Sequence, residues 1–145
     1  MRFSEGIIRS IVNLDSPLYD IVYLYGDRAA VFAQVEAILK EYRGSYPHLR
    51  ILRTDGERFA REHRQNALGG KMPPLPECDL YVFENIEEIA GRETAEQQLY
   101  GILDHQLETG RRILVTGAEP VAHMDILAPR ICAQLSGGVS FCAER

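Results

Sequence analysis

The sequence predicts a three-layer α/β domain in which helices cover both faces of a mainly parallel sheet. Two observations predict this fold. Predicted strands and helices alternate along the chain, and the strands are continuous apolar runs rather than alternating patterns. Continuous apolar runs are typical of strands buried on both faces, which is where parallel strands lie. At 145 residues the chain fits one domain with an adequate core.

Residues 1–20 are predicted to form a short lead-in helix and a turn ahead of the core, which we expect to span residues 21–145. Apolar residues recur there at helical spacing, at Ile7, Ile8, Ile11 and Val12. The segment Asn13-Leu14-Asp15-Ser16-Pro17 then has the composition of a turn. The lead-in helix should therefore be short and amphipathic.

The first strand of the core is predicted over residues 21–25, which are β-branched and aromatic. The helix that follows presents one apolar stripe and should end at Gly44. Phe32 falls on this stripe, so we expect it to pack in the core. A second strand over 49–53 and a more polar helix over 56–68, ending at Gly69-Gly70, follow.

Residues 71–76 contain three prolines and should form no regular structure, because proline lacks a backbone donor. A strand over 80–83 comes next. The following helix, 94–109, should begin with a capping box formed by Thr94 and Gln97 and end at Gly110.

The C-terminal part begins with a strand over 113–116, preceded by two arginines. A short helix is predicted over 126–135, with Pro129 near its first turn, where proline is tolerated. A last strand over 139–142 completes the sheet.

Composition excludes several classes of protein. The formal net charge of -5 gives no reason to expect strong non-specific binding to nucleic acid. The three cysteines and four histidines lack the spacing of a disulfide framework or a metal site. No stretch approaches the ~20 apolar residues of a membrane span, and the N-terminus lacks a signal peptide. We therefore expect a cytoplasmic protein that binds neither metal nor membrane.

Four segments share a pattern with a known family. They are L-Y-G at 24–26, E-R-F at 57–59, D-L-Y-V-F-E-N-I with I-A-G-R-E over 79–93, and L-A-P-R at 127–130. From about Ile21 onward the chain resembles the AAA+ core of the bacterial replication initiator DnaA and of its short, Hda-type regulatory relatives. The resemblance implies a P-loop NTPase-like fold. The chain stops before the helical lid and the DNA-binding domain of the initiators, so we expect a core without a lid.

The resemblance places a phosphate-binding turn at Gly26, Asp27 and Arg28. A working P-loop needs several glycines, and a lysine that meets the phosphate charge. Here one glycine remains, Asp27 adds negative charge, and Val31 or Phe32 stands at the position of the lysine. Phosphate binding should therefore be weakened by several kcal/mol, because charge-assisted hydrogen bonds are the strong ones.

The other nucleotide-binding positions implied by the resemblance are also altered. Glu84 stands at the magnesium aspartate, and Asn85 stands at the acid that orients the attacking water. Asn cannot accept a proton, whereas Glu could still coordinate a metal. Thr116-Gly117-Ala118 stands where the family has T-S-D, the more polar sensor segment that faces the γ-phosphate. No residue is assigned a catalytic role, and we expect no ATP hydrolysis.

Arg130 stands where the family places its arginine finger, which reaches a neighbouring subunit's nucleotide. An intact finger on a scaffold that has lost its own site could act on a partner's ATP. The alternative is an exposed arginine on a short helix. Pro129 departs from the family pattern and could redirect the side chain.

The combined expectation is a non-catalytic interaction module that regulates or accompanies replication initiation. Its partner would be another AAA+ protein, such as an initiator, or a second copy of itself, with no cofactor. A first alternative is a nucleotide sensor or weak ATPase that binds ADP or ATP with magnesium. A second is a DNA-binding accessory factor. Basic residues available for DNA contact are interleaved with acids, which is typical of a solvated face; they are Arg58, Arg61, Arg64 and Lys71.

Overall fold

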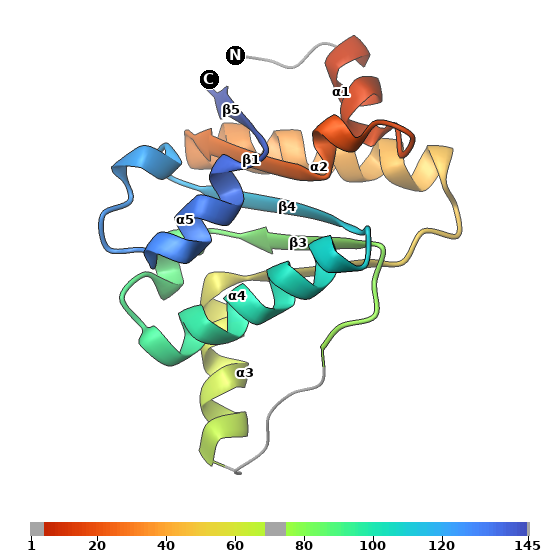
Figure 1. The fold of residues 1–145 in the computed structure, drawn as a ribbon. Coiled ribbons are helices and arrows are strands. Elements are labelled where there is room, and N and C mark those ends of the chain that lie inside the picture. The colour runs from red at the N-terminus through yellow and green to blue at the C-terminus, as the bar shows by residue number, and fades with distance from the viewer. Residues whose placement is uncertain (1–4, 69–74, 145) are drawn as a thin grey trace.

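The computed structural model describes residues 5–68 and 75–144, and within this part of the chain the three-layer α/β prediction is confirmed. Five strands form one sheet in the order β2-β3-β4-β1-β5, and every neighbouring pair is parallel (Figure 1). The strands are β1 (Ile21–Gly26), β2 (Ile51–Asp55), β3 (Leu80–Glu84), β4 (Arg112–Gly117) and β5 (Val139–Ala143). The α-helices are α1 (Glu5–Val12), α2 (Arg28–Ser45), α3 (Gly56–Leu68), α4 (Glu93–Glu108) and α5 (Pro129–Ser136).

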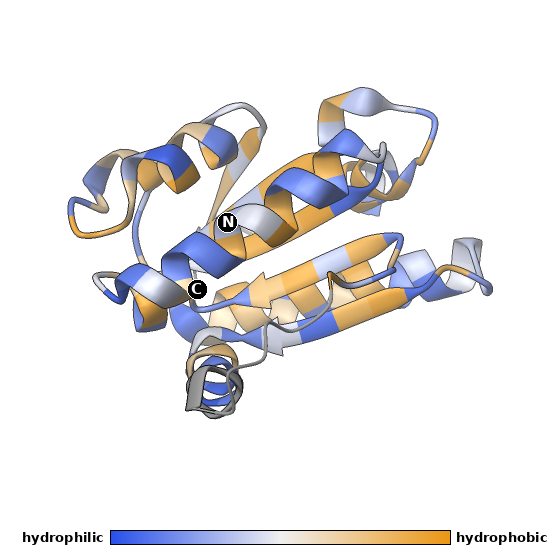
Figure 2. Ribbon diagram, turned by 60° about the horizontal axis from the view of Figure 1, so that its bottom comes forward, coloured by the Kyte–Doolittle hydropathy of each residue, from blue (hydrophilic) through white to orange (hydrophobic). Residues whose placement is uncertain are grey.

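The two faces of the sheet carry separate apolar clusters. On one face, β1, β3 and β4 pack against α1 and α2 through residues that include Leu24, Val82, Leu114, Val35 and Ile38. On the other face, the same strands pack against α3, α4 and α5 through residues that include Phe83, Val115, Phe59, Leu99 and Ile131. Figure 1 shows α4 and α5 in front of the sheet and α2 behind it. The central strands are apolar along their length (Figure 2) because each residue faces one of these two clusters.

A buried arginine holds the lead-in segment against the sheet. The Arg112 side chain, at the start of β4, is 4% exposed. Its guanidinium donates to the carbonyl oxygens of Ile11, Asn13 and Ser16, each at 2.6 Å, and to the Tyr42 hydroxyl at 3.0 Å. A buried arginine needs its donors satisfied, and here the backbone of the lead-in segment accepts them.

Two predicted helix boundaries were wrong. Helix α4 begins at Glu93, with Arg92 as its N-cap and no side-chain cap bond, so Thr94 lies inside the first turn and forms no capping box. The buried Glu96 instead accepts a hydrogen bond from Ala128 N at 2.6 Å, which joins α4 to the start of α5. Helix α2 continues past Gly44 to Ser45, because a helical glycine near the end costs little.

Other boundaries differ by a few residues. Strand β2 covers 51–55 rather than 49–53, and α5 starts at Pro129 rather than at 126. The stop of α4 at Gly110 is confirmed by its φ of 71°, a conformation that favours glycine. Three short 3₁₀ helices were not predicted, at Pro17–Tyr19, Ile86–Ile89 and Val121–His123. The predicted stop at Gly69-Gly70 and most of the proline-rich segment lie outside the described residues.

Within the described ranges, no helix combines the length and apolar character needed to cross a membrane.

Candidate functional site

A cleft of about 820 Å³ lies at the carboxyl ends of the strands. In open α/β sheets this edge is the usual place for ligands. The cleft brings together five of the residues predicted from the resemblance, namely Asp27, Arg28, Glu84, Asn85 and Thr116. Gly26 directly precedes Asp27, whereas Arg130 is not part of the lining.

The turn between β1 and α2 is a single residue long. Strand β1 ends at Gly26 and α2 begins at Arg28, so only Asp27 lies between them. The Asp27 carboxylate accepts a hydrogen bond from Ala30 N at 3.0 Å, and the Asp27 N–H donates to Ala143 O at 3.1 Å. A helix N-terminus ordinarily attracts an anion. Here the chain's own carboxylate caps that end.

Gly26 fits this turn only because it has no side chain. Its φ is 126°, and a Cβ at this position would lie 2.3 Å from Ala143 O on β5. A side chain here would therefore collide with backbone, which cannot move away as a flexible side chain could. The remaining glycine of the predicted P-loop serves the close packing of β1, α2 and β5.

The two residues that stand at the lysine position have different environments. Val31 is buried, at 5% exposure, as part of the core below α2. Phe32 is 54% exposed and lines the cleft, so the prediction that it packs in the core was wrong. Consecutive helical residues point about 100° apart, and the sheet accepts Val31 and Val35 rather than Phe32. The Arg53 guanidinium lies 5.4 Å from the centre of the Phe32 ring.

The carboxylate of Glu84, at the predicted magnesium position, is bound by an arginine of the same chain, Arg53. Arg53 contacts both Glu84 carboxylate oxygens, at 2.5 and 3.2 Å, and also contacts Glu36 at 2.6 Å. The Glu84 side chain is 13% exposed and that of Arg53 is 28% exposed. Hydrogen bonding to Glu84 raises the pKa of the Arg53 guanidinium above its ordinary value. A cation already neutralises this carboxylate, so a magnesium ion here would compete with the chain's own guanidinium.

Asn85 and Thr116 bond to each other. Asn85 has a left-handed backbone, φ 58° and ψ 57°, which Asn tolerates better than most residues. Its backbone N–H donates to the Thr116 hydroxyl at 3.0 Å. Thr116 is 1% exposed. This hydrogen bond joins the residue after β3 to the end of β4. The Thr116 hydroxyl is therefore already an acceptor within the chain.

Arg130 lies on the opposite side of the sheet from α2, on the exposed first turn of α5. Its guanidinium lies 4.5 Å from the centre of the Tyr100 ring on α4, in a cation–π contact. The contact orients the exposed arginine along the α4–α5 surface.

Sequence reasoning missed Arg53 and Glu36. A charged residue inside a predicted buried strand was the available signal, because such a residue needs a partner. The partner came from parallel pairing, which places the end of β2 beside the end of β3, with Asp55 opposite Glu84. Among the basic residues considered for DNA contact, Arg58 pairs with Glu62 at 3.1 Å. The side chains of Arg64 and Lys71 lie outside the described part of the molecule.

No protein-family model matches the chain. A curated relative, the chromosomal replication initiator protein DnaA of Sphingopyxis alaskensis, is 25% identical over 136 residues, which cover 90% of this chain and 30% of the relative. The chain therefore spans about a third of the length of this relative.

Two solved structures have the same fold. AMPPCP-bound DnaA from Aquifex aeolicus matches 99% of this chain and 48% of its own, with a TM-score of 0.84 and 14% identity. Domain III of the Thermotoga maritima replication initiation protein DnaA matches 99% of this chain and 65% of its own, with a TM-score of 0.83 and 13% identity. The described residues thus have the three-layer, P-loop NTPase-like fold of these DnaA structures, as the resemblance predicted.

Proposed function

We propose that this chain, a DnaA-like AAA+ core, is a non-catalytic interaction module that takes part in replication initiation through contacts with another AAA+ protein or with a second copy of itself. The connection to replication comes from the similarity to DnaA, at 25% identity over most of the chain. The absence of catalysis is argued from the cleft.

The observation that carries the proposal is the one-residue turn between β1 and α2. A P-loop wraps phosphates with successive backbone N–H groups of a longer, glycine-rich loop. Here Asp27 alone spans the gap, and its carboxylate already accepts the Ala30 N–H. A phosphate would have to displace that carboxylate and would meet its negative charge.

The Arg53–Glu84 pair supports the same conclusion from the metal side. Coordination of magnesium by Glu84 would require breaking a two-point contact with Arg53 in a partly buried position. The freed guanidinium would then lie beside the metal, where like charges repel. Both the phosphate site and the metal site are therefore filled by groups of the chain itself.

Thermal unfolding with and without Mg-ATP tests the proposal. A ligand at about 100 times its dissociation constant stabilises the native state by about 2.7 kcal/mol, or roughly 5–10 °C for a domain of this size. We expect no change in Tm at about 1 mM Mg-ATP, where an intact site of micromolar affinity would be saturated. A shift of several degrees that disappears without nucleotide would refute the proposal. Magnesium alone and sodium sulfate at equal ionic strength are the controls.

Arg130 is the residue proposed to act on a partner. It is exposed and aligned along α5 by Tyr100, so the guanidinium can reach a docked neighbour. The test measures ATP turnover by a DnaA-type initiator with the wild-type chain, with Arg130→Ala, and with the control Arg9→Ala on the distant α1. Loss of the effect in Arg130→Ala alone supports the role. Equal effects of all three chains would show that Arg130 has no special role in the partner's ATP turnover.

A second candidate function is nucleotide sensing, with ADP or ATP as the cofactor. The cleft volume of about 820 Å³ and the exposed Arg28 at its edge favour it, as does the AMPPCP bound to the similar Aquifex protein. Chromatography of the supernatant after acid precipitation of the purified protein would detect a retained nucleotide. A stoichiometric amount would favour sensing over the proposal above.

DNA binding is the third candidate, since one similar structure is a DnaA bound to AMPPCP and single-stranded DNA. Steep weakening with salt is the expected signature, because binding to phosphates releases counterions. Fluorescence anisotropy with a labelled single strand at two salt concentrations measures it. The net charge of -5 and the Arg58–Glu62 pair argue against strong binding.

A further inference from the structure

A second cavity, of about 480 Å³, lies where the 3₁₀ helix Ile86–Ile89 meets the loop between β4 and α5. We call it the Ile126 groove. Figure 1 shows this loop leaving β4 and turning back to the start of α5. The apolar residues of the lining come from both segments and are Ala90, Ala118, Met124, Ile126 and Leu127.

The most exposed large apolar side chain of the described residues lies in this groove. Ile126 is 73% exposed, whereas the next residue, Leu127, is 2% exposed and packs in the core. A Cβ at Gly91 would lie 3.1 Å from Ile126 Cγ2, so the isoleucine rests against the backbone of Gly91. A partner that covered Ile126 would remove apolar surface from water, which is favourable.

The loop between β4 and α5 is held in place by buried groups. The Tyr23 hydroxyl, on β1, donates to Glu119 O at 2.7 Å and lies 3.3 Å from Met124 Sδ. At the other end of the loop, Ala128 N donates to the buried Glu96 on α4 at 2.6 Å. The groove is therefore already formed in the free domain, and binding does not have to order the loop.

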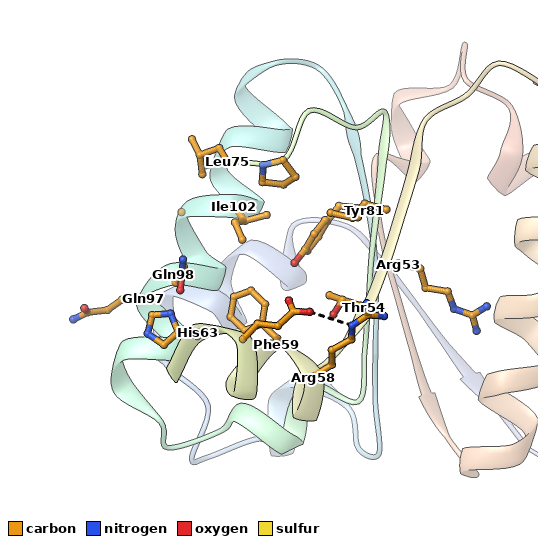
Figure 3. A pocket seen from close by; sticks show the side chains of 14 residues that line it. Arg53, Thr54, Arg58, Phe59, His63, Leu75, Tyr81, Gln97, Gln98 and Ile102 are labelled. Carbon is orange, nitrogen blue, oxygen red and sulfur yellow. Dashed lines mark hydrogen bonds and ion pairs between the residues drawn. The ribbon is translucent and has the colours of Figure 1, made fainter. Parts of the chain in front are cut away.

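The exposed acids of the groove are not neutralised. Glu119 and Asp125 are exposed, and neither forms an ion pair with another described residue. Among the described residues that line the groove there is no lysine or arginine. In the cavity between β2, α3 and α4, by contrast, Arg58 bonds to Glu62 at 3.1 Å within the lining (Figure 3). Charge therefore favours a positively charged partner at the Ile126 groove.

The pattern fits a segment of a protein better than a free ion. Among the described residues, no three histidine, cysteine, aspartate or glutamate side chains are placed to hold a metal ion. Glu87 and His123 also line the groove, but Glu87 Oε2 is buried. The acids that a partner can reach are Glu119 and Asp125. Lysine and arginine match them, because their apolar stems pack on apolar surface while their charged ends bond to carboxylates.

We propose that the Ile126 groove docks a basic segment of a partner protein. An apolar side chain of that segment covers Ile126, and flanking lysine or arginine side chains lie against Glu119 and Asp125. The inference rests on the proposed function only in that the chain acts by contacting another protein. It uses neither Arg130 nor the strand-end cleft.

Titration of the ¹⁵N-labelled chain with a short basic peptide tests the proposal. The probe is acetyl-Gly-Lys-Leu-Lys-Leu-Lys-Gly-amide, and its control has glutamine in place of each lysine. Backbone amide resonances of Ala118, Asp125 and Ile126 should move as the probe is added, because these residues line the groove. The control peptide should bind about two- to tenfold more weakly, since it lacks the charges that meet the two acids. No movement at these three amides, or equal binding of both peptides, would overturn the proposal.

Two exposed apolar residues offer matched variants. Ile126→Ser should weaken binding of the lysine probe at least about fivefold, through the loss of apolar contact. Leu75→Ser, in the cavity of Figure 3, removes a side chain that is 47% exposed and should have no effect. Both native side chains are exposed, so both variants should fold. Equal affinity of the two variants for the probe would contradict the groove as the docking site.

Two double variants separate the groove from a general attraction to a negative chain. Glu119→Gln with Asp125→Asn should weaken the lysine probe about two- to tenfold and leave the glutamine control unchanged. Glu57→Gln with Glu108→Gln removes the same charge from exposed positions of α3 and α4 and should change neither affinity. Equal losses in the two double variants would show attraction to net charge only and would overturn the proposal.

Other occupants of the groove would be recognised in the same spectra. Movement of the Ile126 amide as the protein concentration rises, without peptide, would mean that a second copy covers the groove, and would overturn the proposal. Ala118, Asp125 and Ile126 do not line the strand-end cleft. A positive result with Mg-ATP or a negative one with Arg130→Ala would therefore leave this inference standing.

Discussion

Arg53 is the residue that most changes the chemistry of the strand-end cleft. It bridges Glu84 and Glu36 and lies over the Phe32 ring, so one side chain connects β2, β3 and α2. Its function could not be predicted from the local sequence, because both acids are distant along the chain. By contrast, the family resemblance predicted that Glu84, Asn85 and Thr116 belong to one site, and they do line one cleft at the carboxyl ends of the parallel strands.

Removal of Arg53 should destabilise the domain. In Arg53→Gln, the partly buried Glu84 carboxylate loses its partner, and we expect a cost of about 1–3 kcal/mol in the free energy of unfolding. Urea denaturation measures it. The double variant Arg53→Gln with Glu84→Gln should recover much of the loss, because the uncompensated charge is then removed. Equal stability of the single and double variants would show that no charge was left unpaired.

Gly26 and Gly101 offer a matched pair of substitutions to alanine. Gly26→Ala should cost about 1–3 kcal/mol or prevent folding, since its φ is 126° and its Cβ would meet Ala143 O. Gly101 lies within α4, and a Cβ there meets nothing within 4 Å. Gly101→Ala should therefore stabilise the domain by about 0.4–1 kcal/mol. Thermal unfolding of both variants checks the opposite signs, and the same sign for both would contradict the structure.

Glu87 should lower the stability of the domain as pH rises, which is the opposite of what most carboxylates do. Burial raises the pKa of the Glu87 carboxyl above its ordinary value, and its Oε2 atom has no partner among the described residues. The native state then holds the proton more tightly than the unfolded state, so this group lowers stability as pH rises through and above the ordinary glutamate range.

Glu87→Gln should therefore be more stable than the wild type at neutral pH, and the difference should shrink as pH falls below the ordinary glutamate pKa. Urea midpoints at several pH values measure this. Glu57→Gln, at an exposed position of α3, is the control. A variant that loses stability at neutral pH would show that the charged form is stabilised in the native domain.

At the scale of elements, the strands were predictable and the helix ends were not. The central strands β1, β3 and β4 are short apolar runs, and their positions are set by burial on two faces, whereas the more polar edge strand β2 begins two residues later than predicted. Helix ends depend on contacts distant in sequence. The Thr94–Gln97 capping box that was predicted for α4 does not form. The start of this helix is set instead by the bond from Ala128 N to Glu96 and by the packing of Ala95 in the core. The 3₁₀ helix at Ile86–Ile89 follows from the burial of both of its end residues.

The lead-in segment should depend on Arg112. Arg112→Met leaves the carbonyl oxygens of Ile11, Asn13 and Ser16 without this donor, and we expect a loss of about 3–5 kcal/mol. Arg112→Lys keeps the charge but lacks the planar guanidinium, so its free energy of unfolding should lie between those of the wild type and Arg112→Met. Hydrogen exchange of the α1 amides should accelerate in the methionine variant. Retained protection there would mean that apolar packing alone holds the segment.

At the scale of the whole molecule, the three-layer architecture was predictable from strand–helix alternation, and the fold shared with the DnaA structures was predictable from the 79–93 pattern. The division into residues 1–20 and 21–145 is still a prediction. The Arg112 contacts and the burial of Ile11 and Val12 favour a lead-in segment that is part of the same cooperative unit.

Unfolding should therefore be a single transition. Circular dichroism reports the helices, and tyrosine fluorescence reports the packing of the seven tyrosines, of which Tyr42 and Tyr46 bond to the lead-in segment. The two urea curves should coincide, as in two-state unfolding. A separate, earlier fluorescence transition would show that residues 1–20 come away from the sheet independently.

The short connection between β1 and α2 also has a consequence for timing. Proteins that read a nucleotide alternate between shapes as the terminal phosphate is present or lost. Under the function proposed above, a helix end capped by the chain's own Asp27 would not alternate in this way. A protein that docks on this domain would then meet the same surface whether or not nucleotide is present.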